Sequence, residues 1–285
     1  MTQVGIDRPA VSVEELRRAW AAVQAGDFRA NTTRAHMPGG IRSQAPAPRA
    51  ISSTWRPGAG ETVLPVLGCG GATGATTVAV ALATVAGGNA RVVECASVTS
   101  SGLAAASTAE MGTYESAWSR GTRDQVLLER VTEVLTTADE IPHPTTPDRQ
   151  IDLTVLDVGW ELGQVLTTPG WIGEAIRNAD HLVLTTTATV PGVRRLEGAL
   201  DLLQGSHASA AVLGPRRKKW PKGVEHAGGQ ATGDLDRHGL LTEIPDDPVL
   251  AVNGLTGSAL PKPLLAAAHQ LLQRVQQDPT KGTPQ

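Results

Sequence analysis

From residue 61 onward, short apolar segments alternate with helical patterns, and this alternation limits the possible fold more than any other feature of the sequence. Continuous apolar runs such as "LTVLDV" and "HLVLTTT" offer no polar face to water, so they are expected to be buried on both faces. Buried strands separated by helices are typical of a mostly parallel, doubly wound α/β sheet covered by helices on both sides. The sequence therefore predicts this fold class.

The expected elements follow from the same patterns. We predict strands at residues 63–67, 91–95, 152–157, 181–186 and 209–213, with a further short segment near 240–244. Helices are predicted at 75–86, at about 170–178, at 191–204 and at about 261–277. The stretch from about 101 to 138 is predicted to be mostly helical, and its arginines either pair with glutamates along a helix face or reach phosphates.

The chain divides into four predicted parts. Residues 1–28 are expected to form an N-terminal helical segment, because a capping box of the S-x-x-E type precedes an apolar helical stripe. Residues 29–60 are rich in Pro and Arg without periodicity, so they are predicted to be a disordered, flexible linker. The α/β domain is expected at 61–277, and a disordered tail at 278–285.

The charges are unevenly distributed along the chain. The formal net charge is -3, but residues 1–58 carry eight Arg against four acids, so they contribute +4 and residues 59–285 contribute -7. An acidic body argues against a surface coated with cations for nucleic acid. A DNA contact through the basic linker nevertheless stays open.

Cysteine and histidine usage argues against a disulfide-rich protein and against a metal site of the common sequence spacings. Two cysteines are too few for a disulfide framework, and the seven histidines show no metal-ligand spacing. The first residues contain no apolar signal core, and no run of about 18 apolar residues occurs. We therefore expect a cytoplasmic chain without stable membrane association.

The glycine-rich loop after the first strand is the main candidate for a functional site. In a phosphate-binding P-loop, glycines turn backbone N–H groups toward phosphate oxygens, and the following helix N-terminus adds partial positive charge. The segment "GCGGATGATT" stands in this position, and its nucleotide-binding candidates are Gly70, Gly71, Ala72, Thr73, Gly74, Ala75, Thr76 and Thr77. The strict G-x-x-x-x-G-K-[ST] motif fails twice, since Cys69 replaces the first glycine and Ala75 the lysine. A tight turn that binds nothing is the alternative.

The surrounding segments give this loop a context. Over residues 61–277 five segments occur in this order: "GGATGATTVAVALA", "RVVECAS", "IDLTVLDVG", "ADHLVLTTTATVPGVRRLEGALDLL" and "GLLTEIPDDP". Through these segments the chain resembles the ParA/MinD family, the deviant-Walker P-loop ATPases that position plasmids, chromosomes, division sites and secretion machines. The region 100–130 is more weakly similar to MinD-like proteins of actinobacterial mobile elements. The resemblance implies a P-loop NTPase-type fold, ATP or ADP with Mg²⁺ as cofactors, and a protein partner or a homodimer.

The chain departs from the family pattern at positions that ATP hydrolysis depends on. The P-loop lysine is replaced by Ala75, and the water-orienting second aspartate of D-x-D is replaced by Ala96, two positions after Glu94. The family's adenine-reading asparagine would fall near Gly214-Pro215. Phosphoryl transfer depends on positioned charge, and one missing clamp costs on the order of 10² to 10³ in rate. We therefore expect no efficient ATP hydrolysis.

The sequence leaves three functions to compare. The first is a degenerate ParA/MinD-like module that binds or regulates, in plasmid or chromosome partitioning, DNA transfer or secretion-machine positioning. The second is a slow ATPase whose lysine comes from elsewhere, with Lys218 and Lys219 as candidates in this chain. The third is a DNA-associated scaffold without nucleotide.

Thr76 and Asp157 retain the two metal-side positions of the resemblance. They either hold a nucleotide-bound Mg²⁺ weakly, or serve only as a helix-start residue and a strand-end hydrogen-bond acceptor. The residues alone do not choose between these roles.

A second candidate site is a cluster of cations directly after the strand at 209–213. This basic loop consists of Arg216, Arg217, Lys218, Lys219 and Lys222 around Trp220. Cations interleaved with an aromatic ring suit a phosphate backbone or a base, whereas a solvated loop is the simpler interpretation. The last helix, at about 261–277, has an apolar face but little positive charge, so we expect it to pack on the sheet rather than on a membrane.

Overall fold

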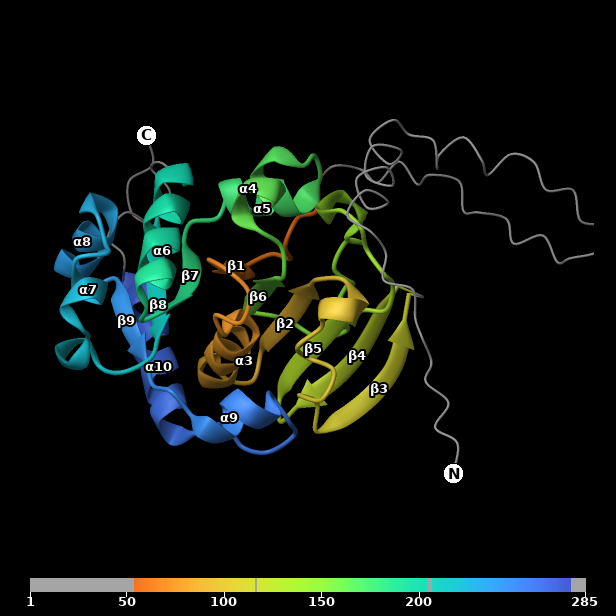
Figure 1. Cartoon of the computed structure of the whole chain (residues 1–285). Helices are drawn as coiled ribbons and strands as arrows, with labels where there is room; N and C mark the ends of the chain where they lie inside the picture. The colour runs from red at the N-terminus through yellow and green to blue at the C-terminus, as the bar shows by residue number, and fades with distance from the viewer. Residues whose placement is uncertain (1–53, 116, 204–206, 278–285) are drawn as a thin grey trace, which may run out of the picture. The chain divides into compact units, whose positions relative to one another are not determined.

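The computed structural model describes residues 54–115, 117–203 and 207–277. The predicted helical segment at 1–28, the predicted linker up to residue 53 and the predicted tail at 278–285 lie outside the described residues. The described part contains a nine-stranded, mostly parallel sheet with flanking helices (Figure 1). The predicted α/β fold class is therefore confirmed.

The strands are β1 (Thr62–Gly68), β2 (Ala90–Cys95), β3 (Ala109–Tyr114), β4 (Trp118–Arg123), β5 (Val126–Val131), β6 (Leu153–Val158), β7 (Leu182–Thr187), β8 (Ala208–Leu213) and β9 (Leu241–Ile244). The α-helices are α3 (Ala75–Ala86), α4 (Leu162–Thr167), α5 (Trp171–Arg177), α6 (Val190–Leu202), α7 (Lys222–Glu225), α8 (Gln230–Arg237), α9 (Pro248–Asn253) and α10 (Lys262–Gln277). Short 3₁₀ helices are η2 (Val98–Ser100), η3 (Ala138–Glu140) and η4 (Arg217–Lys219).

The strand order places the loop after β1 near the middle of the sheet. This order is β3-β4-β5-β2-β6-β1-β7-β8-β9, and β4 runs antiparallel to both of its neighbours while the other pairs are parallel. In register, Asp157 of β6 stands between Glu94 of β2 and Val66 of β1. The carboxyl ends of parallel strands meet at one edge of a sheet, and that edge is where ligands bind in open α/β folds.

The prediction of a mostly helical stretch from about 101 to 138 is wrong. This segment forms β3, β4 and β5, which extend the parallel sheet by an antiparallel hairpin and an edge strand. Asp124 lies between β4 and β5 with a φ of 52°, a left-handed conformation that Asp tolerates in hairpin turns. Arg120 and Glu129 do not lie along a helix face, since they are opposite each other in the hairpin register and are both buried.

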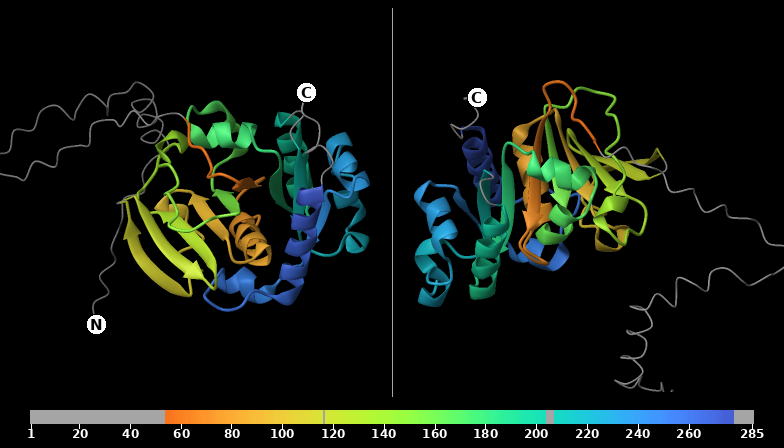
Figure 2. Two further views of the ribbon diagram at one scale, coloured as in Figure 1. Left: turned by 180° about the vertical axis from the view of Figure 1, so that it is seen from behind. Right: turned by 90° about the horizontal axis from the view of Figure 1, so that it is seen from above.

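Helices cover both faces of the sheet, and each face has its own apolar core (Figure 2). Alternate residues of a strand point to opposite faces, so Leu64 and Val66 of β1 pack with α3 and α10, whereas Leu67 packs with α4, α5 and α6. The glycine-rich loop therefore leaves β1 between two packed layers, which hold its ends in place.

Helix α10 packs as predicted. Its apolar face is buried in the same core as α3, through Leu264, Ala267, Ala268, Leu271, Leu272 and Val275. Among the described helices, none combines the length and the apolarity that a membrane span requires.

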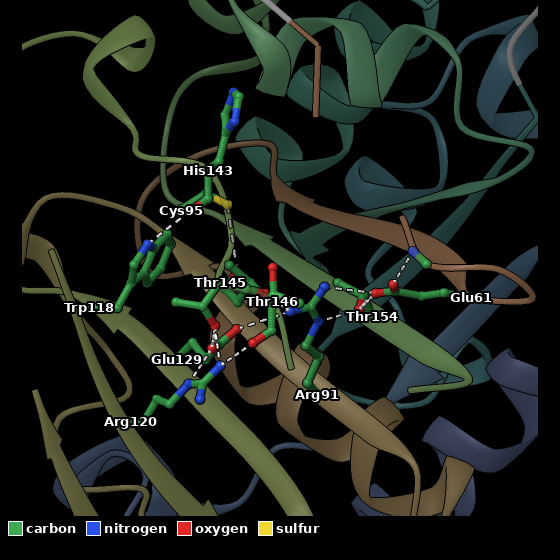
Figure 3. Close-up of polar contacts among 12 residues, drawn as sticks. Glu61, Arg91, Cys95, Trp118, Arg120, Glu129, His143, Thr145, Thr146 and Thr154 are labelled. Atoms are coloured by element: carbon green, nitrogen blue, oxygen red, sulfur yellow. Dashed lines mark hydrogen bonds and ion pairs between the residues drawn. The ribbon is translucent and has the colours of Figure 1, made fainter. Parts of the chain in front are cut away.

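A cluster of buried charges joins the antiparallel hairpin to the parallel sheet (Figure 3). Arg91 of β2 binds Glu61 at 2.8 Å and Glu129 of β5 at 3.3 Å, and Arg120 of β4 binds Glu129 at 2.8 Å. Thr154 and Thr145 add hydrogen bonds to the same groups. Each charge of this cluster therefore has an opposite partner, which is the condition for burying it at all.

Residues 54–60, at the end of the predicted linker, belong to the described part of the chain. Trp55 meets Trp171 edge to face, with ring centroids 5.4 Å apart, and packs against the core that contains α5. This contact ties the chain just before β1 to the helical layer.

Candidate phosphate-binding site

The glycine-rich loop lies at the carboxyl end of β1 and lines a cavity of about 820 Å³. Every predicted nucleotide-binding residue from Gly70 to Thr77 borders this cavity. The other walls come from Asp157 at the end of β6, Gly102 after β2 and Arg195 of α6. The structure thus brings the loop and the predicted metal-side aspartate to one cavity.

The backbone of the loop is arranged to leave its N–H groups free. Gly74 precedes α3 with a φ of 78°, and Ala72 has a φ of 57°. The first bond of the helix runs from the Val78 N–H to the Gly74 carbonyl, at 2.9 Å. Among the described residues, none accepts a hydrogen bond from the backbone N–H groups between Gly70 and Thr77. Free donors at the start of a helix favour an anion.

Two features favour glycine at position 74. A φ of 78° favours glycine, and a Cβ added there would lie 2.5 Å from Cδ2 of Leu213 at the end of β8. The start of α3 therefore lies close to the Leu213 side chain at the end of β8.

Thr73 and Cys69 stabilise the shape of the loop through hydrogen bonds and add no charge to it. The Thr73 hydroxyl donates to the Gly70 carbonyl at 3.0 Å and lies 3.0 Å from the Thr185 hydroxyl. The Cys69 N–H donates to the Thr185 carbonyl at 2.8 Å. Burial raises the pKa of the Cys69 thiol to about 12, so this side chain stays neutral.

Thr76 and Asp157 are in contact, as their predicted shared site requires. The Thr76 side chain lies near Asp157, which is 2% exposed, and lowers the pKa of that carboxyl. Burial, and then the charge of Glu94 on the next strand, raise the pKa of Asp157 to about 7 against an ordinary value of 3.8. A hydroxyl and a carboxylate are hard oxygen donors of the kind Mg²⁺ prefers.

The carboxylate of Glu94 is hydrogen-bonded to the loop that follows β2. Its carboxylate accepts hydrogen bonds from the Ser101 hydroxyl and the Gly102 N–H, both at 2.6 Å, and from the Leu103 N–H at 3.1 Å. Burial raises the pKa of Glu94, and these hydrogen bonds oppose that shift. Gly102 is held so close to Thr76 that a Cβ on it would lie 2.9 Å from the Thr76 hydroxyl. Glu94 therefore positions one wall of the cavity.

Arg195 is a site residue that no sequence pattern indicated. It extends from α6 to the glycine-rich loop, where a Cβ added to Gly70 would lie 3.0 Å from its Nη1 atom. The local pattern of "GVRRLEG" carries no sign of this contact, because Arg195 and Gly70 are far apart in the sequence. The one available indication was that α6 starts at the sheet edge that carries the loop.

The basic loop lies elsewhere, beside a second cavity of about 750 Å³ that Arg216 and Arg217 line. Trp220 is 8% exposed and donates from Nε1 to the Pro215 carbonyl at 2.9 Å, so its ring is not available for stacking on a base. Arg217 pairs with Asp236. Lys218 and Lys219 are exposed, and neither lines the cavity of the glycine-rich loop. They are therefore not positioned to replace its lysine.

The donor set for a metal is small. In the described part of the chain, no three His, Cys, Asp or Glu side chains lie together as a metal site. Mg²⁺ is usually held by one or two protein oxygens together with water and substrate phosphates, so the Thr76 and Asp157 pair fits it only in company with a nucleotide.

Similarity to known proteins is confined to the fold. No protein-family model matches the chain, and a search of curated proteins also finds no match. A plasmid partition protein from Borrelia burgdorferi is 13% identical, with 75% of this chain and 96% of that chain covered and a TM-score of 0.45. A chain of the MinC:MinD cell division protein complex of Aquifex aeolicus is 14% identical, with coverages of 79% and 98% and a TM-score of 0.45.

A third similar structure is the cell division ATPase MinD of Pyrococcus furiosus. It is 13% identical, with 75% of this chain and 99% of that chain covered and a TM-score of 0.45. At sequence identities this low, the similarity to these three proteins is one of fold and says nothing about function. The chain itself has a nine-stranded, mostly parallel sheet with the glycine-rich loop between β1 and α3. The chain is thus similar, over most of its length but at low identity, to solved plasmid partition and MinD cell division proteins.

Proposed function

We propose that the chain binds ATP or ADP weakly through the glycine-rich loop, with Mg²⁺, and acts as a binding or regulatory module without efficient hydrolysis. The observation that carries this proposal is the row of unpartnered backbone N–H groups from Gly70 to Thr77, within the described part of the chain, beside a cavity of about 820 Å³. Such donors stay available to phosphate oxygens although the lysine is absent.

Thr76 and Asp157 would hold the metal. Both residues line the cavity, and Thr76 lies near enough to Asp157 to lower the pKa of its carboxyl. A bound Mg²⁺ neutralises phosphate charge. Asp157 must be ionised to act as a ligand, so its raised pKa weakens metal binding below about pH 7.

Efficient hydrolysis is disfavoured by what replaces the water-orienting aspartate. Ala96 is 4% exposed and offers no polar group, and the neighbouring Glu94 is occupied by three hydrogen bonds. The resemblance to the ParA/MinD family supports a role in partitioning, DNA transfer or secretion-machine positioning, in the cytoplasm, with a protein partner or a second copy of the chain.

Calorimetric titration with Mg-ATP and Mg-ADP tests the proposal. We expect dissociation constants in the upper micromolar to millimolar range, on the order of 10⁻⁴ to 10⁻³ M, and weaker binding when EDTA replaces Mg²⁺. Thr76→Ala and Asp157→Asn should abolish the difference between the two conditions, while Thr84→Ala, a substitution farther along α3, should preserve it. Absence of binding at millimolar nucleotide would contradict the proposal.

A second candidate function is DNA contact through the basic loop. Arg216, Lys218, Lys219 and Lys222 are exposed, and this favours an electrostatic contact that does not need Trp220. The two functions are compatible, because the basic loop and the glycine-rich loop line different cavities.

A further inference from the structure

We infer that Arg195 supplies, from α6, the phosphate-binding cation that the glycine-rich loop lacks at Ala75. The inference deepens the proposed function and rests on it. It assigns the ligand class as a nucleoside di- or triphosphate, or another polyphosphate, held between the loop and α6.

The first support is the contact between Arg195 and the loop. A Cβ on Gly70 would lie 3.0 Å from Nη1, 3.5 Å from Cδ and 3.7 Å from Cζ of Arg195. The side chain therefore lies along the loop, and the missing side chain of Gly70 makes the close approach possible. Both residues line the cavity.

The second support is that this guanidinium is uncommitted. Among the described residues, none forms a hydrogen bond or an ion pair with Arg195. The residue is exposed and lines the cavity, so its guanidinium is accessible to a ligand there. Arg91, Arg120 and Arg123 are instead buried and bind carboxylates or carbonyls. A free guanidinium presents a planar fork of donors that matches phosphate oxygens.

The third support is the anchoring of α6. Thr189 caps the helix by accepting from the Gly192 N–H at 3.1 Å, and Glu197 accepts from the Gly229 N–H at 3.0 Å and the Thr232 N–H at 2.8 Å. The Thr186 hydroxyl of β7 also donates to the Gly192 carbonyl at 2.7 Å, so α6 is attached to the sheet before Arg195 and to α8 after it. A positioned cation loses less entropy on binding than a mobile one.

Arg194 provides a matched control. It is the neighbouring residue of the same helix, carries the same charge and is exposed, but it does not line the cavity. Equal substitutions at the two positions change the net charge equally, but only Arg195 lines the cavity.

The test is calorimetric titration of Arg195→Gln and Arg194→Gln with Mg-ATP and with inorganic pyrophosphate. We expect Arg195→Gln to weaken binding of both ligands by about 10- to 100-fold, the range for one charge-assisted hydrogen bond, with unchanged thermal stability. Arg194→Gln should bind as the wild type does. Ala75→Lys should restore binding to Arg195→Gln, and it should gain more there than in the wild type, because the two cations serve the same phosphates.

The outcomes separate the two proposals. If the wild type binds and the two glutamine variants behave alike, the inference about Arg195 fails and the proposed function stands. If the wild type binds neither ligand at millimolar concentration, both fail.

Discussion

Ala96 lies against Gly159 so closely that a Cβ added to Gly159 would come within 2.6 Å of the Ala96 Cβ. The two residues follow the neighbouring strands β2 and β6, at the sheet edge that carries the glycine-rich loop. The position that the ParA/MinD resemblance assigns to a water-orienting carboxylate is thus filled by apolar packing.

Ala96→Asp should therefore destabilise the protein without restoring hydrolysis. Ala96 is 4% exposed, and a carboxylate there would be buried against Gly159. We expect the free energy of unfolding to fall by ~2 to 4 kcal/mol, measured by urea denaturation, with phosphate release at background. Ala227→Asp, at a half-buried position in the segment after α7, is the control for an added aspartate. Steady turnover by Ala96→Asp would show that the carboxylate can be accommodated.

Ala75→Lys should tighten Mg-ATP binding at least several-fold, because the new ammonium would meet phosphates already held by the loop. Ala75 lines the cavity at the first position of α3. Hydrolysis should stay at background, since Ala96 still leaves the water unoriented. Calorimetry and a phosphate-release assay check the two parts. Turnover that Asp157→Ala abolishes would contradict the second.

Asp157→Asn should stabilise the metal-free protein at pH 8 more than at pH 5. Because the pKa of Asp157 is raised on folding, the folded protein keeps a proton on this carboxyl at pH values where the unfolded chain has lost it. The stability of the folded state is therefore highest below pH 3.8, and it falls as the pH rises through about 7 and the buried carboxyl becomes charged. The difference between the two pKa values of Asp157 corresponds to a change in the free energy of unfolding of at most ~4 kcal/mol. Urea denaturation at both pH values measures it, with Asp148→Asn, an exposed position, as control. Equal effects at pH 5 and pH 8 would show that Asp157 is ionised throughout.

Glu129→Gln should lower the free energy of unfolding by about 3 kcal/mol, because it leaves Arg91 and Arg120 with a buried excess of positive charge. Denaturant midpoints measure the change. Glu133→Gln, an exposed glutamate after β5, should have an effect below about 0.5 kcal/mol. Similar midpoints for the two variants would mean that the buried cluster contributes no net stability.

Replacement of both Lys218 and Lys219 by Gln should weaken duplex DNA binding and lower the slope of log K against log salt by about two, because each phosphate contact releases about one counterion. Both lysines are exposed. Fluorescence anisotropy over a salt series measures the slope. Lys262→Gln, at the start of α10, should leave it unchanged. An unaltered slope in the double variant would exclude Lys218 and Lys219 as DNA contacts.

The sequence by itself determined the parallel core and the place of the loop. Runs such as β6 and β7 are buried along nearly their whole length, and a strand that is buried on both faces requires helices on both faces. The loop between β1 and α3 could be located because its glycines and the apolar helix after it are local features. The packing of α10 followed in the same way from its apolar face and its few cations.

Only the tertiary structure decided the rest, because it depends on contacts between residues distant in the sequence. The hairpin of β4 and β5 has charged residues at spacings that also suit a helix, and the buried pairing of Arg120 with Glu129 exists only once the strands are paired. Trp220 looked like a stacking ring beside cations until its burial was known. The approach of Arg195 to Gly70 depends on how α6 packs, and no local pattern carries that information.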